Sequence, residues 1–229
     1  MRKLLLVALL APLAALAAEA GFRLDPSPHD PRDITSLQAG ARTFVNYCLG
    51  CHGAQYMRNS GLTAIGLSEA QIRDNLMFTA DKVGEPMRSN MSVKEGKQWF
   101  GVAPPDLSVI ARSRGPDWLY TYLRTFYRDP KAATGWNNAV FPNVGMPHAL
   151  WMLQGERAYE KGQWQEISKG TQSPTEYDAT VRDLVNFLAY VGEPHAASRK
   201  AYGVITLFVL GVVFILAWLL KKEYWKDVK

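Results

Sequence analysis

The chain has 229 residues, enough for one substantial domain with additional terminal segments. Its composition, 48% hydrophobic and 21% charged, is ordinary for a globular protein. The formal charge of +5 is compatible with nucleic-acid binding, but residues 19–198 carry 18 Lys and Arg against 19 Asp and Glu, a formal charge of −1. The basic excess therefore belongs to the two ends of the chain, which border apolar runs, and this excludes a nucleic-acid-binding surface.

Residues 1–20 have the pattern of a signal peptide. Arg2 and Lys3 precede an uncharged apolar run from Leu4 to Ala18, and the Ala-rich sequence after it offers small residues for cleavage. A membrane anchor would need about 20 apolar residues, which this run does not reach. We therefore expect export of the segment that follows.

A helix is predicted to begin near Thr35 or Ser36 and to run into the sequence Cys48-Leu49-Gly50-Cys51-His52. This stretch contains both cysteines of the chain, and C-x-x-C-H is the attachment motif of a c-type haem. Two thiols at this spacing can form thioethers to one macrocycle, and the next imidazole can bind the iron. The motif therefore predicts one covalently attached haem c, with His52 as an iron ligand.

Three other interpretations of the motif are weaker. A redox dithiol is expected in a thioredoxin-like setting and does not need the histidine. A zinc site normally takes four protein ligands, and the chain has no second cysteine pair. A disulfide that closes so small a loop would stabilise the fold little.

The middle of the chain predicts short helices joined by loops. Residues 67–77 indicate a helix capped by Ser68, and residues 118–127 an aromatic helix. Between them, Pro104 and Pro105 hold the chain extended before a short helix capped by Asp106 or Ser108.

Residues 128–150 form a long Gly-, Pro- and Asn-rich stretch, and loops of this length are usually functional. Residues 151–173 show no clear pattern. A last soluble helix is predicted to open at Pro174 and to end near Gly192.

Residues 201–220 are uncharged and long enough to span a bilayer. Two basic residues precede this run and four lysines follow it, so the positive-inside rule places the C-terminal tail in the cytoplasm. The resulting division is a signal peptide (1–20), a periplasmic cytochrome c domain (21–198), a transmembrane helix (199–221) and a cytoplasmic tail (222–229).

The second iron ligand is expected to be Met146, which lies between Gly145 and Pro147 and precedes the last soluble helix. A helix, C-x-x-C-H, a methionine loop and a final helix follow one another in the class I cytochrome c fold. Met91 and His148 are the alternatives. A thioether ligand raises the haem potential relative to two histidines.

Several separated motifs resemble the cytochrome c1 family, the haem c subunits of bacterial cytochrome bc1 complexes. The resemblance covers nearly the whole chain, including the signal peptide and the C-terminal anchor. It rests on residues 46–52 (NYCLGCH), 103–108 (APPDLS), 145–147 (GMP), 184–190 (LVNFLAY) and 192–194 (GEP).

The resemblance implies a mainly α-helical, class I cytochrome c-like haem domain with long loops and one C-terminal transmembrane helix. It implies covalent attachment at Cys48 and Cys51 and axial ligation by His52 and Met146. The haem pocket would include Pro104, Pro105, Ile110 and Phe141, and Arg114, or else Arg112, would pair with a haem propionate.

The resemblance further implies a location in the bacterial inner membrane, with the haem domain on the periplasmic side. The protein would not be an enzyme by itself. It would pass single electrons from a Rieske iron–sulfur protein to a cytochrome c acceptor, alongside cytochrome b in a dimeric complex. The alternatives are a stand-alone membrane-anchored cytochrome c and a haem enzyme or sensor with an open iron site.

Overall fold

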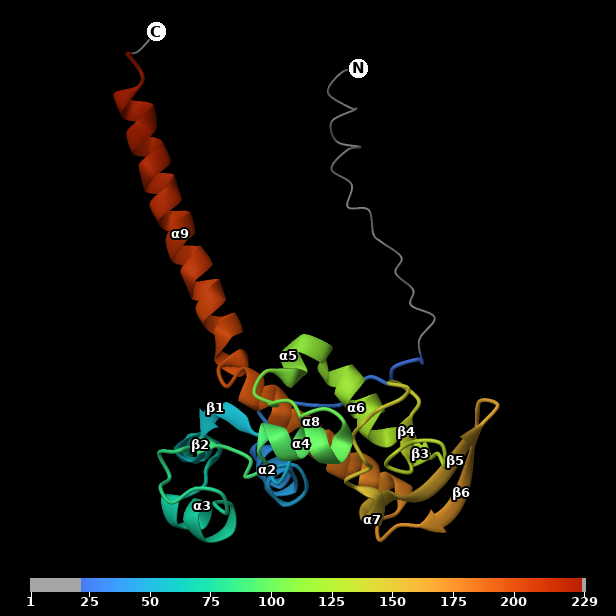
Figure 1. Ribbon diagram of the computed structural model, residues 1–229. Helices are drawn as coiled ribbons and strands as arrows, with labels where there is room; N and C mark the ends of the chain where they lie inside the picture. The colour runs from blue at the N-terminus through green and yellow to red at the C-terminus, as the bar shows by residue number, and fades with distance from the viewer. Residues whose placement is uncertain (1–21, 228–229) are drawn as a thin grey trace, which may run out of the picture.

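The computed structural model describes residues 22–227, without the side chains of residues 197 and 200. The predicted signal peptide lies outside the described residues. Within them the fold is mainly α-helical, with long loops and one apolar C-terminal helix, α9, that projects from the rest of the molecule (Figure 1). The predicted fold class is therefore confirmed.

The helices are short except for α2, α8 and α9. They are α2 (Ile34–Tyr47), the 3₁₀ helix η1 (Asn59–Ile65), α3 (Glu69–Asn75), α4 (Val93–Phe100), α5 (Ile110–Arg114), α6 (Pro116–Arg124), α7 (Trp151–Gln154), α8 (Pro174–Gly192) and α9 (Ala196–Tyr224).

The strands form three separate antiparallel pairs. These pairs are β1 (Ala54–Arg58) with β2 (Pro86–Met87), β3 (Phe126–Arg128) with β4 (Trp136–Asn138), and β5 (Gly155–Glu160) with β6 (Gln163–Lys169). The β5–β6 hairpin projects from one end of the domain (Figure 1).

The core is built on the packing of α2 against α8. Gly40 lies at their closest approach, where an added Cβ would fall 2.0 Å from the carbonyl oxygen of Asp183. Phe44 and Phe187 meet across the contact with ring centroids 5.7 Å apart, and both are fully buried. Burying a side chain of this size contributes roughly 1.5–3 kcal/mol, so this interface stabilises the end of α2 that leads into the C-x-x-C-H motif.

The predicted apolar faces of α2 and α8 are confirmed. Each expected core position is at most 6% exposed: Leu37, Ala41, Phe44 and Val45 in α2, and Val181, Leu184, Val185 and Leu188 in α8. The start of α8 is fixed by a capping box, in which Ser173 and Glu176 satisfy each other's backbone N–H groups. Ser68 caps α3 in the same way, as predicted.

Two helix starts differ from the sequence-based prediction. Helix α2 is capped by Asp33, which accepts from the N–H of Ser36, rather than by Thr35 or Ser36. Helix α5 has no side-chain cap, because Asp106 and Ser108 bind the backbone of residues 55 and 56 instead. The partners of Asp106 and Ser108 are distant in sequence and could not be read from the local pattern.

Other boundaries also differ. The aromatic helix α6 ends at Arg124, three residues earlier than expected, because Phe126 begins β3. Helix α4 and the β5–β6 hairpin had no predicted counterpart. All seven residues of β6 are exposed, so the strand lacks the apolar alternation by which a half-buried strand is recognised.

Residues 201–224 of α9 form a helix long and apolar enough to cross a membrane. The most apolar part of this helix is not buried against the domain, so its side chains are left for another environment. A 29-residue helix extends about 44 Å at 1.5 Å per residue, longer than the roughly 30 Å bilayer core.

Candidate functional site

The C-x-x-C-H loop is a tight turn at the end of α2. The N–H of Cys48 donates to Phe44 (2.8 Å), and the N–H groups of Cys51 and His52 both donate to the carbonyl of Cys48 (3.0 and 2.8 Å). The two half-buried cysteines form no disulfide with each other. Burial raises the pKa of the Cys48 thiol to about 12 and also raises that of Cys51, so both are protonated at neutral pH.

The imidazole of His52 is oriented by a backbone carbonyl 53 residues away. Its Nδ1 lies 2.7 Å from the carbonyl oxygen of Pro105. Because a carbonyl can only accept, Nδ1 carries the proton and Nε2 keeps its lone pair. Burial lowers the pKa of His52, so the ring is neutral and able to bind a metal through Nε2.

The A-P-P-D-L-S segment binds the chain directly after His52. The N–H of Leu107 donates to Gly53 (2.7 Å), the N–H of Gln55 donates to Asp106 Oδ2 (2.9 Å), and the N–H of Tyr56 donates to Ser108 Oγ (3.0 Å). Asp106 Oδ1 also accepts from the N–H of Ser108 (2.9 Å). The motif therefore holds both the His52 ring and the strand that follows it.

We expect Asp106→Ala to lower the free energy of unfolding by about 1–2 kcal/mol, because two backbone N–H groups lose a charged acceptor at a partly solvated position. Asp106→Asn keeps one acceptor oxygen and should lose about half as much. Thermal unfolding of the two variants checks this prediction. Equal losses in both would contradict the hydrogen-bonding role assigned to the carboxylate.

The sulfur of Met146 is contacted by a phenol that sequence reasoning did not single out. The hydroxyl of Tyr122 donates to Met146 Sδ (3.3 Å). The Tyr122 ring is fixed between Trp118, stacked at 4.7 Å, and the edge of Phe126 at 5.0 Å. Burial raises the pKa of Tyr122, so its hydroxyl remains a donor well above neutral pH.

Tyr122→Phe should lower the reduction potential of the bound haem by roughly 20–40 mV if Met146 binds the iron. A hydrogen bond of about 0.5–1 kcal/mol draws electron density from the sulfur, and a weaker sulfur donor favours the reduced iron. A redox titration followed in the visible spectrum measures the shift. Tyr120→Phe is the control, because the Tyr120 ring lies against Arg124 (4.5 Å) instead; equal shifts in both variants would refute the assignment.

Two of the predicted pocket residues, Arg114 and Phe141, lie together with Trp118. The Arg114 guanidinium is 5.2 Å from the centroid of the Trp118 ring and 5.9 Å from that of the Phe141 ring. Trp118 stacks on Tyr122, and the hydroxyl of Tyr122 contacts the sulfur of Met146. Pro105 lies on the His52 side, and Pro104 lies beneath α4, where a Cβ on Gly96 would fall 2.6 Å from the Pro104 ring.

Three further candidates have other surroundings. Ile110, which opens α5, is half-buried and packs on the core. Met91 lies beside α4, its sulfur 3.6 Å from where a Cβ on Gly96 would be. Arg112 lies on the opposite side of α5, toward Gly192 of α8.

His148, the alternative ligand, is part of the core. It is 2% exposed, its ring stacks on Phe126 at 4.8 Å, and its Nε2 lies 2.8 Å from Gln154 Oε1. Burial lowers the pKa of His148 to about 3, so the ring is neutral. These contacts make it a packed, hydrogen-bonded core histidine.

The loops of His52 and Met146 are linked through one segment of chain. Gly145 packs against residues 100–102, with a Cβ there 3.1 Å from the carbonyl oxygen of Phe100. Five residues after Phe100, Pro105 binds His52. Two thiols, a neutral imidazole with Nε2 available, and the thioether of Met146 are the donors that a c-type haem requires.

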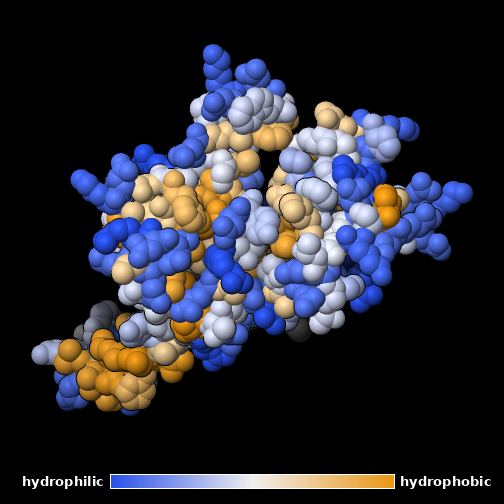
Figure 2. Space-filling model, turned by 90° about the horizontal axis from the view of Figure 1, so that it is seen from below, coloured by the Kyte–Doolittle hydropathy of each residue, from blue (hydrophilic) through white to orange (hydrophobic). Residues whose placement is uncertain are grey.

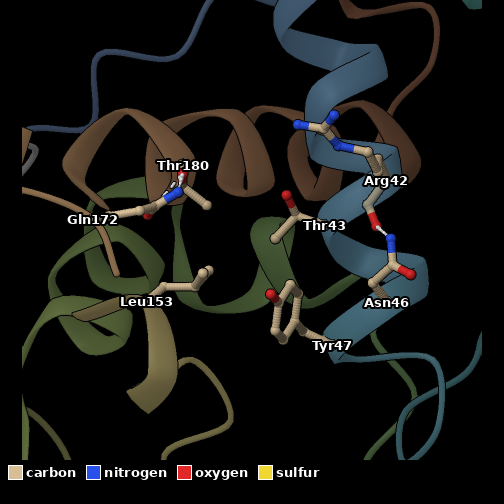
Figure 3. Close-up of a pocket in the computed structure, with 7 residues that line it drawn as sticks. All are labelled: Arg42, Thr43, Asn46, Tyr47, Leu153, Gln172 and Thr180. Carbon is tan, nitrogen blue, oxygen red and sulfur yellow. Dashed lines mark hydrogen bonds between the residues drawn. The ribbon is translucent and has the colours of Figure 1, made fainter. Parts of the chain in front are cut away.

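A surface pocket lies beside the last turns of α2. Its volume is about 480 Å³, and it lies between α2, α7 and the start of α8 (Figure 3). It contains none of the predicted site residues, although Tyr47 directly precedes Cys48. Its lining comprises Arg42, Thr43, Asn46, Tyr47, Leu153, Gln172 and Thr180. Seen from below, the molecule as a whole has a hollow between two lobes, with apolar surface along it and polar surface around it (Figure 2).

Comparison with known proteins identifies the family. The model of the Cytochrome C1 family matches residues 27–228. The chain is 48% identical to a cytochrome c1 of Allochromatium vinosum, over the whole of both proteins. It is 50% identical to a protein named ammonia monooxygenase gamma subunit from Nitrosomonas europaea, over 98% of this chain and 97% of the relative.

A more distant relative bears the family name as well. A cytochrome c1 of Rhodospirillum rubrum is 28% identical, over 86% of this chain and 83% of the relative. A solved structure titled as a hyperthermophilic respiratory Complex III is 18% identical, with a TM-score of 0.44, and covers 90% of this chain and 81% of its own.

The fold and the site together define a haem protein of the c type with a helix that could anchor it in a membrane. The chain belongs to the cytochrome c1 family. It is accordingly an electron-transport protein and a subunit of a respiratory complex.

Proposed function

We propose that this chain carries one haem c, attached through Cys48 and Cys51 and ligated by His52 and Met146. The observation that carries the proposal is the arrangement of the His52 and Met146 side chains. A hydrogen bond orients each of them: Nδ1 of His52 donates to the carbonyl oxygen of Pro105, and the hydroxyl of Tyr122 donates to the sulfur of Met146. A bound haem c supplies a one-electron couple between ferric and ferrous iron.

The surroundings of His52 and Met146 suit an electron relay, because they would hold both side chains in place when the iron changes its charge. The Pro105 carbonyl keeps the proton on Nδ1 of His52, and buried Tyr122 keeps its hydroxyl on the Met146 sulfur. The Tyr122 ring is stacked on Trp118 and meets Phe126 edge to face, and these two contacts restrict its rotation. Pro104, Pro105, Ile110 and Phe141 would border the macrocycle.

The Arg114 guanidinium would pair with a propionate from its position beside Trp118 and Phe141. A guanidinium that stacks on rings is positioned in advance for a planar carboxylate.

In this proposal the chain takes single electrons from a Rieske iron–sulfur protein and passes them to a cytochrome c acceptor. It works beside cytochrome b in a dimeric complex of the bacterial inner membrane. Membership of the cytochrome c1 family supports this role. Helix α9 would span the membrane, and the excess of lysines after it supports a periplasmic haem domain and a cytoplasmic tail.

Purification of the full chain from membranes in a mild detergent tests the assignment. We expect cytochrome b and a Rieske protein to co-purify, with a redox-active c-type haem in the same fraction. Recovery of the haem protein without those partners would instead support a stand-alone membrane-anchored cytochrome c.

Carbon monoxide distinguishes the relay from a haem enzyme or sensor with an open iron site. The Nitrosomonas europaea relative is named as a subunit of a monooxygenase, and oxygen chemistry at a haem needs such an open position. If Met146 fills the sixth position, the reduced protein should bind carbon monoxide weakly at neutral pH. Strong binding would overturn the six-coordinate relay.

A further inference from the structure

Residues 88–102, called the strap below, contact both of the loops that would hold the haem. At one end the Ser89 hydroxyl donates to the carbonyl of Gly50, inside the C-x-x-C-H loop (2.8 Å). At the other end Val102 packs on Gly145, next to Met146, with its Cγ1 3.3 Å from where a Cβ on Gly145 would be. Figure 1 shows α4, the helix of the strap, lying between the β1–β2 pair and the β3–β4 pair.

The middle of the strap packs closely on the A-P-P segment and presents its other face outward. A Cβ on Gly96 would lie 2.6 Å from the Pro104 ring and 3.2 Å from the Cα of Ala103. Large apolar side chains nevertheless stay exposed, with Val93 at 65% and Trp99 at 59%. Exposed tryptophan and aliphatic groups inside a polar rim are typical of the centre of a protein–protein contact.

The charge of the strap is opposite to that of the domain. Arg88, Lys94 and Lys97 are exposed, and Glu95 is the single acid, which gives a formal charge of +2. Since residues 19–198 carry −1 in total, the rest of that range carries −3. The strap is therefore a local positive region on a slightly acidic domain.

The cations of the strap are free of salt bridges to the rest of the described chain. Among the residues that the structure describes, neither Arg88, Lys94 nor Lys97 belongs to any of the salt bridges. Glu95 is engaged, because its carboxylate accepts from the N–H of Ser92 in a capping box (2.9 Å). The adjoining residues 78–87 add two acids and one lysine, which leaves the positive sign of the surface unchanged.

We propose that the strap is the docking surface for the electron acceptor, and that the acceptor presents an acidic face. This inference rests on the proposed relay function. One electron would pass from the reduced haem iron of this chain to the oxidised centre of the acceptor, with no proton or atom transferred. Opposite charge would speed the encounter, and the exposed Trp99 would pack in the contact.

The test compares two probes of opposite charge made from one redox protein: basic mitochondrial-type cytochrome c and the same protein succinylated on its lysines. The full-length haem-loaded chain in detergent is reduced, and its oxidation by each probe is followed by stopped flow. We expect the succinylated probe to react about tenfold faster at low ionic strength, with a difference that shrinks as salt is raised.

The decisive variant is Lys94→Glu/Lys97→Glu, which should slow the succinylated probe about tenfold and accelerate the basic one. Lys161→Glu/Lys169→Glu is the matched control. It changes the net charge equally, but in the β5–β6 hairpin, and should change each rate less than about twofold.

Equal effects of the two double variants would mean that only net charge matters, and would overturn the docking surface. A faster reaction of the wild type with the basic probe would overturn the acidic acceptor. These results would leave the relay itself intact. If the reduced, six-coordinate protein transferred electrons to neither probe, the proposed function would fail instead.

Discussion

Met146→Leu is expected to leave the haem covalently attached while lowering its reduction potential by on the order of 100 mV or more, within the roughly 0.8 V range that axial ligands control. Leucine keeps the volume of the side chain but has no lone pair for the iron. A thioether ligand stabilises the reduced iron more than the oxidised iron, so its loss destabilises the reduced state more and lowers the potential. The attachment survives because Cys48, Cys51 and His52 belong to a separate loop.

Two readouts separate this effect from damage to the fold. The potential is measured by redox titration, and ligation by carbon monoxide binding to the reduced protein, which should become strong in the variant. Met91→Leu is the matched control, because Met91 lies against Gly96 of α4. An unchanged potential in Met146→Leu, or a larger change in Met91→Leu, would remove Met146 as the ligand.

His148→Phe completes the comparison of candidate ligands. Because His148 is stacked on Phe126 and bonded to Gln154, its loss should cost stability and leave the sixth ligand in place. A variant that unfolds at lower temperature and keeps its haem spectrum would agree with Met146 as the ligand. A changed spectrum at constant fold would point to His148.

Gly40→Ala should destabilise the domain by about 3 kcal/mol or more, one of the largest single-residue effects expected here. Alanine in a helix normally gains about 1 kcal/mol over glycine. Here the new methyl would lie 2.0 Å from the carbonyl oxygen of Asp183, a backbone atom of α8 that cannot rotate away. The clash therefore outweighs the propensity, and α2 and α8 must move apart.

Thermal unfolding of the haem-loaded protein measures the effect. For a domain of this size the loss corresponds to roughly 6–12 °C in the midpoint. Gly84→Ala is the control, since no atom lies within 4 Å of a Cβ at that position, and it should change the midpoint little. Similar midpoints for Gly40→Ala and the wild type would show that the α2–α8 contact relaxes without cost.

Features set by residues close in sequence were predicted well. The apolar stripes of α2 and α8, the Ser68 cap and the final apolar helix each follow from patterns within one element. The C-x-x-C-H motif is equally local. The predicted cap of α5 failed because a distant partner displaced the local one. Asp106 could cap α5, yet it binds Gln55, 51 residues earlier.

The role of Tyr122 shows the same limit at the site. It lies on a helix with several aromatic residues, and helical spacing cannot say which ring reaches a sulfur 24 residues away. The strap was missed for another reason. Helix α4 of the strap packs on Pro104 through Gly96. The helix therefore lacks the stripe of large apolar side chains that predicts a packed helix.

The sequence by itself determined the haem attachment motif, the order of the main helices and the apolar span. These depend on chemistry and periodicity within a few residues. Only the tertiary structure decided that Pro105 orients His52, that Tyr122 donates to Met146, and that the basic strap contacts both loops. Such contacts join residues far apart in the sequence, so they depend on how the elements pack and not on any local pattern.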